Sequence, residues 1–267
     1  MKNYKKKIYV WASDLSDKTG EGVLANIYLN RLKKNYVINI INKPNTNKNT
    51  FTHKYFEPYY GIFKLWLKYF SRKETCYLNY LPMWNFLIFL ILPPKIKLGP
   101  ITGGSKKKFD WSIDSLIRNF LFPLFYTLSN IILSFRFESL IFSTSLLKKK
   151  LFKNIVNKSL FNFVFLNFKI KKDKIIKKNQ FIIYYKKHSN KDYRDLLNIS
   201  SNNFFKKKKY KFIVVGERIK QKGFINKGYV KREKLNKLLS ESKYAYGSKE
   251  NYYSLFAIDS INNNTPL

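Results

Sequence analysis

Apolar and polar positions along the first forty residues predict a strand, a helix and a second strand. Residues 8–11 (IYVW) form a compact β-type run, and after Gly22 apolar side chains recur at helical spacing as far as Leu32. Residues 36–41 (YVINII) return to a β-type pattern. Because a strand, a helix and a strand in this order form a parallel βαβ unit, the chain is predicted to begin with an α/β domain.

Further elements are predicted along the remaining chain. Up to residue 170, helices are expected over 56–70, 113–134 and 146–158, and strands over 75–80, 97–104, 140–143 and 163–166. After residue 180, strands are expected over 180–185, 211–216 and 244–247, with a helix around 233–239. Lysines crowd the segment between these halves, which favours a solvated linker over a binding tract. We therefore divide the chain into an α/β domain over 1–170, a basic linker over 171–179 and a second α/β domain over 180–267.

The charge of the chain adds candidate partners without selecting one. Lys and Arg number 52 against 16 Asp and Glu, a formal net charge of +36. Such a balance suits a nucleic acid, an anionic membrane surface or an acidic small substrate. Lys, Asn, Ile, Phe and Tyr are all over-used, as expected of an A+T-rich coding sequence, and we assign about half of the excess charge to that bias.

The rare residue types exclude several classes of protein. One cysteine, Cys76, and two histidines leave neither a disulfide scaffold nor a Cys/His zinc cluster, so a reducing compartment and no metal are expected. Cys76 itself is interpreted as a buried small hydrophobe. The apolar run at Leu81–Leu92 is shorter than the roughly 18–20 residues that span a bilayer. No signal peptide is recognised, and a cytoplasmic location is expected, with peripheral contact with the inner face of an anionic membrane as an addition.

The last forty residues carry the most specific pattern. A Gly228-Tyr229-Val230 turn leads into a helix and a small-residue strand, and an acid-bearing loop then leads into a helix that runs to Thr265-Pro266-Leu267. This arrangement resembles the nucleotide-sugar-binding domain of group 1 (family four) glycosyltransferases of the GT-B fold. The resemblance implies two Rossmann-like α/β domains, with 1–170 on the acceptor side and 180–267 binding the donor. It also implies metal-independent transfer with retention of configuration and no cofactor besides the nucleotide sugar.

A donor site follows from helix physics and from this resemblance together. A loop that enters a helix N-terminus presents unpaired N–H groups and binds diphosphate, and Tyr253, Ser254 and Leu255 form that turn. Asp259, further along the helix, matches the family's acid that holds the ribose. The family's two acids lie eight positions apart and Glu250 lies nine before Asp259, so either Glu250 or Asn251 would face the transferred sugar.

Two further segments match the family less specifically. Lys186 and Lys191 stand where the family has an Arg and a Lys that neutralise the leaving diphosphate, with Lys187 as a substitute. The alternative for this segment is a solvated basic loop. Gly20, Glu21 and Gly22 resemble the family's N-terminal glycine loop, although a glycine before a helix is also an ordinary cap. A second glycine turn, 99–104, either lines a cleft or only reverses the chain.

The predicted function is transfer of a hexosyl group from a nucleotide sugar to a glycan or lipid-linked acceptor, in polysaccharide or cell-envelope synthesis. In the family, a strand and several helices follow the position of Leu267, so a truncated second domain is expected. A non-catalytic remnant of such an enzyme is one alternative. A basic nucleic-acid-binding protein is another, although no RRM, KH or helix-turn-helix pattern is present and no specific nucleic acid is expected.

Overall fold

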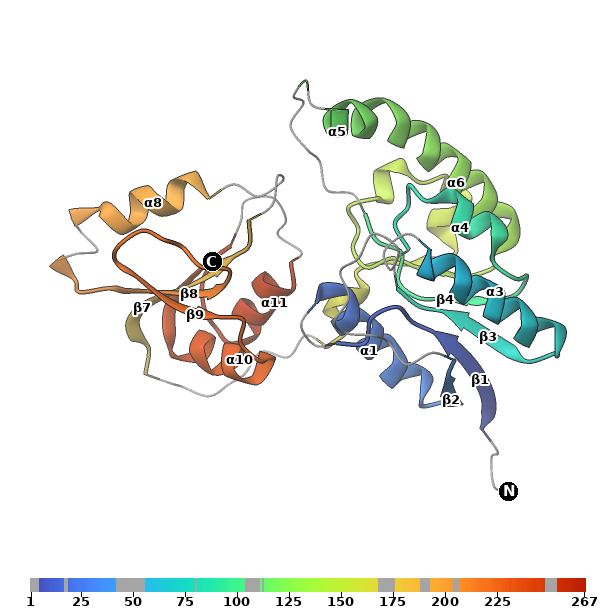
Figure 1. Ribbon diagram of the computed structural model, residues 1–267, viewed down its shortest axis with the longest axis horizontal. Coiled ribbons are helices and arrows are strands. Elements are labelled where there is room, and N and C mark those ends of the chain that lie inside the picture. The colour runs from blue at the N-terminus through green and yellow to red at the C-terminus, as the bar shows by residue number, and fades with distance from the viewer. Residues whose placement is uncertain are drawn as a thin grey trace. The chain divides into compact units, whose positions relative to one another are not determined.

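The computed structural model describes the chain in two compact units. Described are residues 5–16, 19–41, 56–79, 81–103, 111, 113–167, 176–187, 193–203, 207–247 and 254–267. The units are Met1–Val164 and Phe165–Leu267. Each is built on a four-stranded sheet, and all of the strand pairs in both sheets are parallel (Figure 1). The predicted α/β class with Rossmann-like sheets is confirmed.

The sheet of the first unit has the strand order β2-β1-β3-β4. Its strands are β1 (Lys6–Trp11), β2 (Tyr36–Ile40), β3 (Glu74–Tyr77) and β4 (Lys97–Leu98). Helix α1 (Gly20–Leu32) connects β1 to β2, and α3 (Glu57–Phe70) precedes β3. Because the chain moves outward to β2 and then back past β1 to β3, right-handed crossovers put α1 and α3 on opposite faces of the sheet. The order of strands therefore reverses between β1 and β3.

Tight packing between α3 and β1 centres on a glycine. The Trp11 ring is buried and stacks on Tyr77 with 4.8 Å between ring centroids. A Cβ atom at Gly61 of α3 would lie 2.1 Å from Trp11 Cε2. The helix can therefore approach the strand this closely only because position 61 has no side chain.

Cys76 lies on β3 and is fully buried, as predicted. Burial raises the pKa of its thiol to about 12. Because only the thiolate is nucleophilic, we expect less than about one thiol in a thousand to be reactive at pH 8 in the folded chain. Labelling with a thiol-specific reagent should be absent in native buffer and complete in denaturant. Rapid labelling of the native chain would contradict the burial of this residue.

A layer of helices covers one side of the first unit. It contains α4 (Phe86–Ile91), α5 (Ile113–Leu116), a π-helical turn (Ile117–Leu121) and α6 (Phe122–Arg136). The helix predicted over 113–134 is thus confirmed, with one wider turn just before Pro123, whose missing N–H favours such a break. The Arg136 guanidinium donates to the carbonyls of Phe89 (2.9 Å) and Leu92 (2.6 Å), which joins the end of α6 to the end of α4.

The end of the first unit differs from two predictions. The helix expected over 146–158 is instead a 3-10 turn at Lys148–Lys150 and a short α7 (Lys153–Asn157). The strand expected over 163–166 is wrong, because Phe163–Asn167 is a 3-10 helix. Phe163 and Val164 are buried as a strand would be, and a short apolar run cannot distinguish the two structures. A small parallel pair, β5 (Leu140–Ile141) and β6 (Ser159–Leu160), precedes this turn.

The second unit has the strand order β10-β7-β8-β9. Its elements are β7 (Lys178–Tyr185), α8 (Arg194–Ser201), β8 (Lys211–Gly216), β9 (Phe224–Gly228), α10 (Arg232–Glu241), β10 (Ser242–Tyr246) and α11 (Leu255–Asn262). Alternate residues of β7 and β8 enter separate apolar clusters on the two faces, as in a parallel sheet covered on both sides. Strand β9, which exposes much of its length, was not predicted, and neither was helix α8.

The two ends of the second unit are joined by hydrogen bonds. The Lys177 ammonium, just before β7, donates to the Asn263 carbonyl and to Thr265 Oγ1, both at 3.0 Å. The Ala245 N–H of β10 donates to the Pro266 carbonyl at 2.7 Å. Residues that follow α11 therefore run beside β10. Among the described residues, no helix combines the length and apolar character needed to cross a membrane.

Candidate functional site

The topology of the second unit singles out one edge of its sheet. From β7 the chain adds β8 and β9 on one side and then returns to add β10 on the other. The strand order therefore reverses between β7 and β10. Ligands of open parallel sheets bind outside the carboxyl ends of the strands at such a switch point. Lys186 follows β7 there, Gly247 follows β10, and α11 begins shortly afterwards.

The N-terminus of α11 is a well-formed cap. Ser254 has an extended backbone (φ −65°, ψ 147°), and its Oγ accepts a hydrogen bond from the Ala257 N–H at 3.1 Å. The Ile258 N–H donates to the Ser254 carbonyl at 3.1 Å and forms the first backbone bond of the helix. The N–H groups of Leu255 and Phe256 have no acceptor within the helix and point towards its positive end. This geometry suits an anion.

Asp259 lies one turn along the same helix and is buried. Its carboxylate accepts two hydrogen bonds from Arg232 in the first turn of α10, Nη2 to Oδ1 at 2.6 Å and Nε to Oδ2 at 3.2 Å. The pair joins α10 to α11. A carboxylate has about four lone-pair sites, so a ribose hydroxyl would use those that Arg232 leaves available. Sequence analysis gave Arg232 no role, because 27 residues separate it from Asp259.

The segment after β7 is held by its backbone. The Lys186 N–H donates to the Tyr193 hydroxyl at 3.2 Å, and the Lys187 N–H donates to Glu217 Oε2 at 2.8 Å. Glu217 follows β8 and carried no signal in the sequence. Tyr229 donates to Glu217 Oε1 at 3.4 Å, and desolvation together with this carboxylate raises the pKa of the Tyr229 hydroxyl. The Lys186 side chain itself is exposed at the carboxyl edge of the sheet.

Four of the predicted site residues cannot be placed. Lys191, Glu250, Asn251 and Tyr253 lie outside the described residues. Ser254, Leu255, Asp259 and Lys186 are described, and the topology assigns them to the carboxyl side of the second sheet. Among the described residues, no group of three or more His, Cys, Asp or Glu side chains could hold a metal ion.

The first unit has its own switch point between β1 and β3, and one side chain bridges it. Asn79 Oδ1, after β3, accepts from the backbone N–H of Ser13, after β1, at 2.9 Å. The Asn79 amide also donates to the Asp14 carbonyl, and the Asp14 carboxylate accepts from the Ser16 N–H at 2.7 Å and from the Thr19 hydroxyl. The loop that leads into α1 is therefore fixed by its own polar side chains.

The Gly20-Glu21-Gly22 segment forms the first turn of α1, capped by Thr19. A Cβ atom at Gly22 would lie 2.1 Å from the Ser16 carbonyl oxygen, so this position requires glycine. Glu21 and the second glycine turn lie close together, because a small cavity of about 10 Å³ is lined by Glu21, Leu24, Ala25, Leu78, Asn79, Pro100 and Thr102. This volume is about that of one water molecule.

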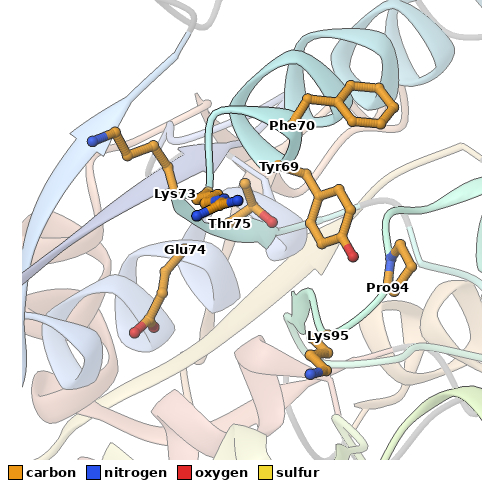
Figure 2. A pocket seen from close by; sticks show the side chains of 8 residues that line it. Tyr69, Phe70, Lys73, Glu74, Thr75, Pro94 and Lys95 are labelled. Carbon is orange, nitrogen blue, oxygen red and sulfur yellow. The ribbon is translucent and has the colours of Figure 1, made fainter.

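A larger pocket of about 420 Å³ lies at the opposite edge of the first sheet, where β3 and β4 begin. Figure 2 shows this pocket, with Tyr69 beside Pro94 and Lys95. Its lining residues are Tyr69, Phe70, Arg72, Lys73, Glu74, Thr75, Pro94 and Lys95. Because it is at the amino ends of the strands, it is not the place where this architecture binds a nucleotide.

Comparison with known proteins identifies the fold. No family model and no curated protein matches the chain. A solved Listeria monocytogenes protein assigned as a UDP-N-acetylglucosamine 2-epimerase is similar over 91% of this chain and 74% of its own, with a TM-score of 0.51 and 8% identity. The Methanocaldococcus jannaschii UDP-GlcNAc 2-epimerase, solved with UDP-GlcNAc and UDP, aligns over 91% of this chain and 78% of its own, with a TM-score of 0.48 and 14% identity. A family 9 glycosyl transferase from Veillonella parvula aligns over 100% and 80%, with a TM-score of 0.35 and 10% identity.

The similarity to the Listeria protein, at 8% identity, concerns the fold alone. The chain has a GT-B-like fold with two Rossmann-like α/β units, as the sequence predicted. Membership of group 1, family four, stays a prediction.

Proposed function

We propose that the chain binds a nucleoside-diphosphate sugar at the carboxyl edge of its second unit and transfers the hexosyl group to a glycan or lipid-linked acceptor. The observation that carries this proposal is the capped N-terminus of α11 next to the β7/β10 switch point. Both the N–H groups and the helix dipole there favour a diphosphate. The GT-B-like fold and the exposed Lys186 at the same edge support the assignment.

The chemistry needs charge and position more than a reactive side chain. As the bond from the sugar anomeric carbon to the diphosphate oxygen breaks, negative charge grows on the leaving group, and the α11 N–H groups with Lys186 and Lys191 stabilise it. The acceptor oxygen bonds to the same carbon, and its proton passes to the departing diphosphate. In this retaining, metal-independent scheme, Glu250 or Asn251 faces the sugar and Asp259 holds the ribose. The first unit, with its Gly20-Glu21-Gly22 turn, supplies the acceptor side.

A proline at the first position of α11 tests the diphosphate site. Leu255→Pro removes the N–H group of that position while preserving the helix, because proline is favoured at a first helical position and Ser254 already has the extended backbone that proline requires. Loss of one charge-assisted hydrogen bond should weaken binding of UDP or GDP by about 10–100-fold. The dissociation constants are measured by titration calorimetry.

Leu255→Ala is the matched control, because it removes the leucine side chain and keeps the N–H group. Its dissociation constant for the nucleotide should lie within about threefold of that of the parent chain. Equal weakening by the alanine and proline variants would contradict a diphosphate at this helix end. If the parent chain binds only a single-stranded oligonucleotide, with a steep dependence on salt, the nucleic-acid hypothesis replaces the transferase.

A further inference from the structure

Helix α3 has two apolar faces. One packs on the sheet through Ile62 and Leu65, which are buried. The other carries large apolar side chains at intervals of three or four residues, all exposed: Phe56, Tyr60, Phe63, Leu67 and Phe70. Phe63 is 59% exposed and Phe70 is 71% exposed. Since a helix of a globular domain normally has a polar outer face, this second stripe calls for a partner.

The neighbouring helices continue this pattern. From α5 to α6, exposed apolar residues recur along one side, namely Ile113, Ile117, Phe120, Leu121, Leu124, Ile131 and Phe135. The short α4 exposes Leu87, Leu90 and Ile91. Phe120 is 68% exposed and Phe135 is 87% exposed. Isolated apolar residues are ordinary on a surface, but stripes on successive helices are typical of an interaction site.

These helices are in direct contact with one another. The Trp66 indole of α3 donates to the Ile91 carbonyl at the end of α4 at 2.8 Å. Phe86 of α4 packs on Phe125 of α6 with 5.5 Å between ring centroids. Figure 1 shows α4 between α3 and α6. The exposed apolar residues of α3, α4 and α5–α6 named above are called the apolar helical face.

Cations border this face at the end of α3. There, the lining of the 420 Å³ pocket contains Arg72, Lys73 and Lys95 together with Tyr69 and Phe70, and Glu74 is the acid in this lining. Apolar and aromatic side chains next to cations are the composition that binds the interface of an anionic bilayer.

We propose that the apolar helical face docks the first unit on a lipid bilayer that carries anionic headgroups. The aromatic and aliphatic side chains enter the interfacial layer, and the cations at the end of α3 contact phosphate. A bilayer is favoured over a protein partner because the stripes are spread over successive helices and cations lie next to the stripe at the end of α3. This inference does not rest on the proposed transferase activity, and its test needs no nucleotide.

The test is sedimentation of the full chain with vesicles of phosphatidylcholine, either alone or with about one third phosphatidylglycerol. The parent chain should bind the anionic vesicles at least about tenfold more tightly than the neutral ones. The combined variant Phe63→Ser, Leu67→Ser and Phe120→Ser should lose at least about tenfold in affinity for the anionic vesicles, because it removes apolar area that enters the interface. Since all three side chains are exposed, folding should be retained, which circular dichroism checks.

A matched control removes exposed apolar side chains elsewhere. Val37→Ser, Leu160→Ser and Ile225→Ser change residues of similar exposure outside the face and should bind vesicles as the parent chain does. A second face variant, Phe70→Ser with Phe135→Ser, should also lose affinity for the anionic vesicles. Arg72→Ser with Lys95→Ser should reduce the preference for anionic vesicles, and Arg218→Ser with Lys220→Ser should not.

Three results would overturn the proposal. The first is a parent chain that does not sediment with anionic vesicles. The second is equal binding by the face variants and the control variant. The third is a face variant that binds vesicles normally but changes from dimer to monomer in light scattering, which would assign the face to a second copy of the chain.

Discussion

Replacement of Gly61 by alanine (Gly61→Ala) is expected to lower the free energy of unfolding of the first unit by about 2–4 kcal/mol. Alanine normally stabilises a helix interior by up to about 1 kcal/mol relative to glycine. A loss of stability in Gly61→Ala would therefore indicate a steric clash at this position. Here the added methyl group would lie 2.1 Å from the buried Trp11 ring. That ring is stacked on Tyr77 and cannot move aside without disturbing the core.

The measurement is urea unfolding of the full chain, followed by tryptophan fluorescence. Lys64→Ala in the same helix is the control and should change the free energy of unfolding by less than about 0.5 kcal/mol. In a Trp11→Leu background, Gly61→Ala should cost much less, because the smaller side chain leaves room for the methyl group. A Gly61→Ala chain as stable as the parent would show that α3 does not approach β1 through this glycine.

Removal of the Arg232 side chain (Arg232→Ala) is expected to destabilise the second unit by about 2–4 kcal/mol. The reason is the Asp259 carboxylate, which is buried and accepts both of its guanidinium hydrogen bonds from Arg232. Without this partner, a buried charge stays partly desolvated. The expected loss in the free energy of unfolding is smaller than for a fully buried ion pair, because one third of the Arg232 side chain is exposed.

Urea unfolding followed by circular dichroism reports this effect, because all four tryptophans lie in the first unit. Arg218→Ala is the control for loss of an exposed arginine. Replacing both partners, Arg232→Met with Asp259→Leu, should restore stability to within about 1 kcal/mol of the parent chain, because no charge is then left buried. If the single and double variants were equally unstable, the loss would come from packing and not from the unpaired carboxylate.

The elements that the sequence predicted best have one consistent pattern along their whole length. Residues 211–216 (KFIVVG) were assigned as a strand and form β8 with the same bounds, since an uninterrupted apolar run suits a strand buried on both faces. The helix over 56–70 was also recognised. Its second apolar stripe was not, because periodicity shows that a helix is rich in apolar residues and does not show that one side has no neighbour.

Site contacts between distant residues could not be predicted. Ser254 at a helix N-terminus follows from local sequence, and the structure has this cap. The Arg232–Asp259 pair and the Asn79 bridge to Ser13 depend on which strands become neighbours, and that is decided by packing of the whole sheet. Predictions for short segments such as Phe163–Asn167 fail for the same reason. Tertiary contacts, and not local preference, determine the backbone conformation of such segments.

The hydrogen bonds from Lys177 to Asn263 and Thr265 bring the entry and the exit of the second unit side by side. A unit whose two ends meet can be opened elsewhere without losing its internal contacts. Circular permutation should therefore be tolerated, with a short linker from residue 267 back to residue 177 and new ends in the exposed turn around Lys222 and Gly223. The second unit thus has the connectivity of a transferable module that could be inserted into a loop of another protein.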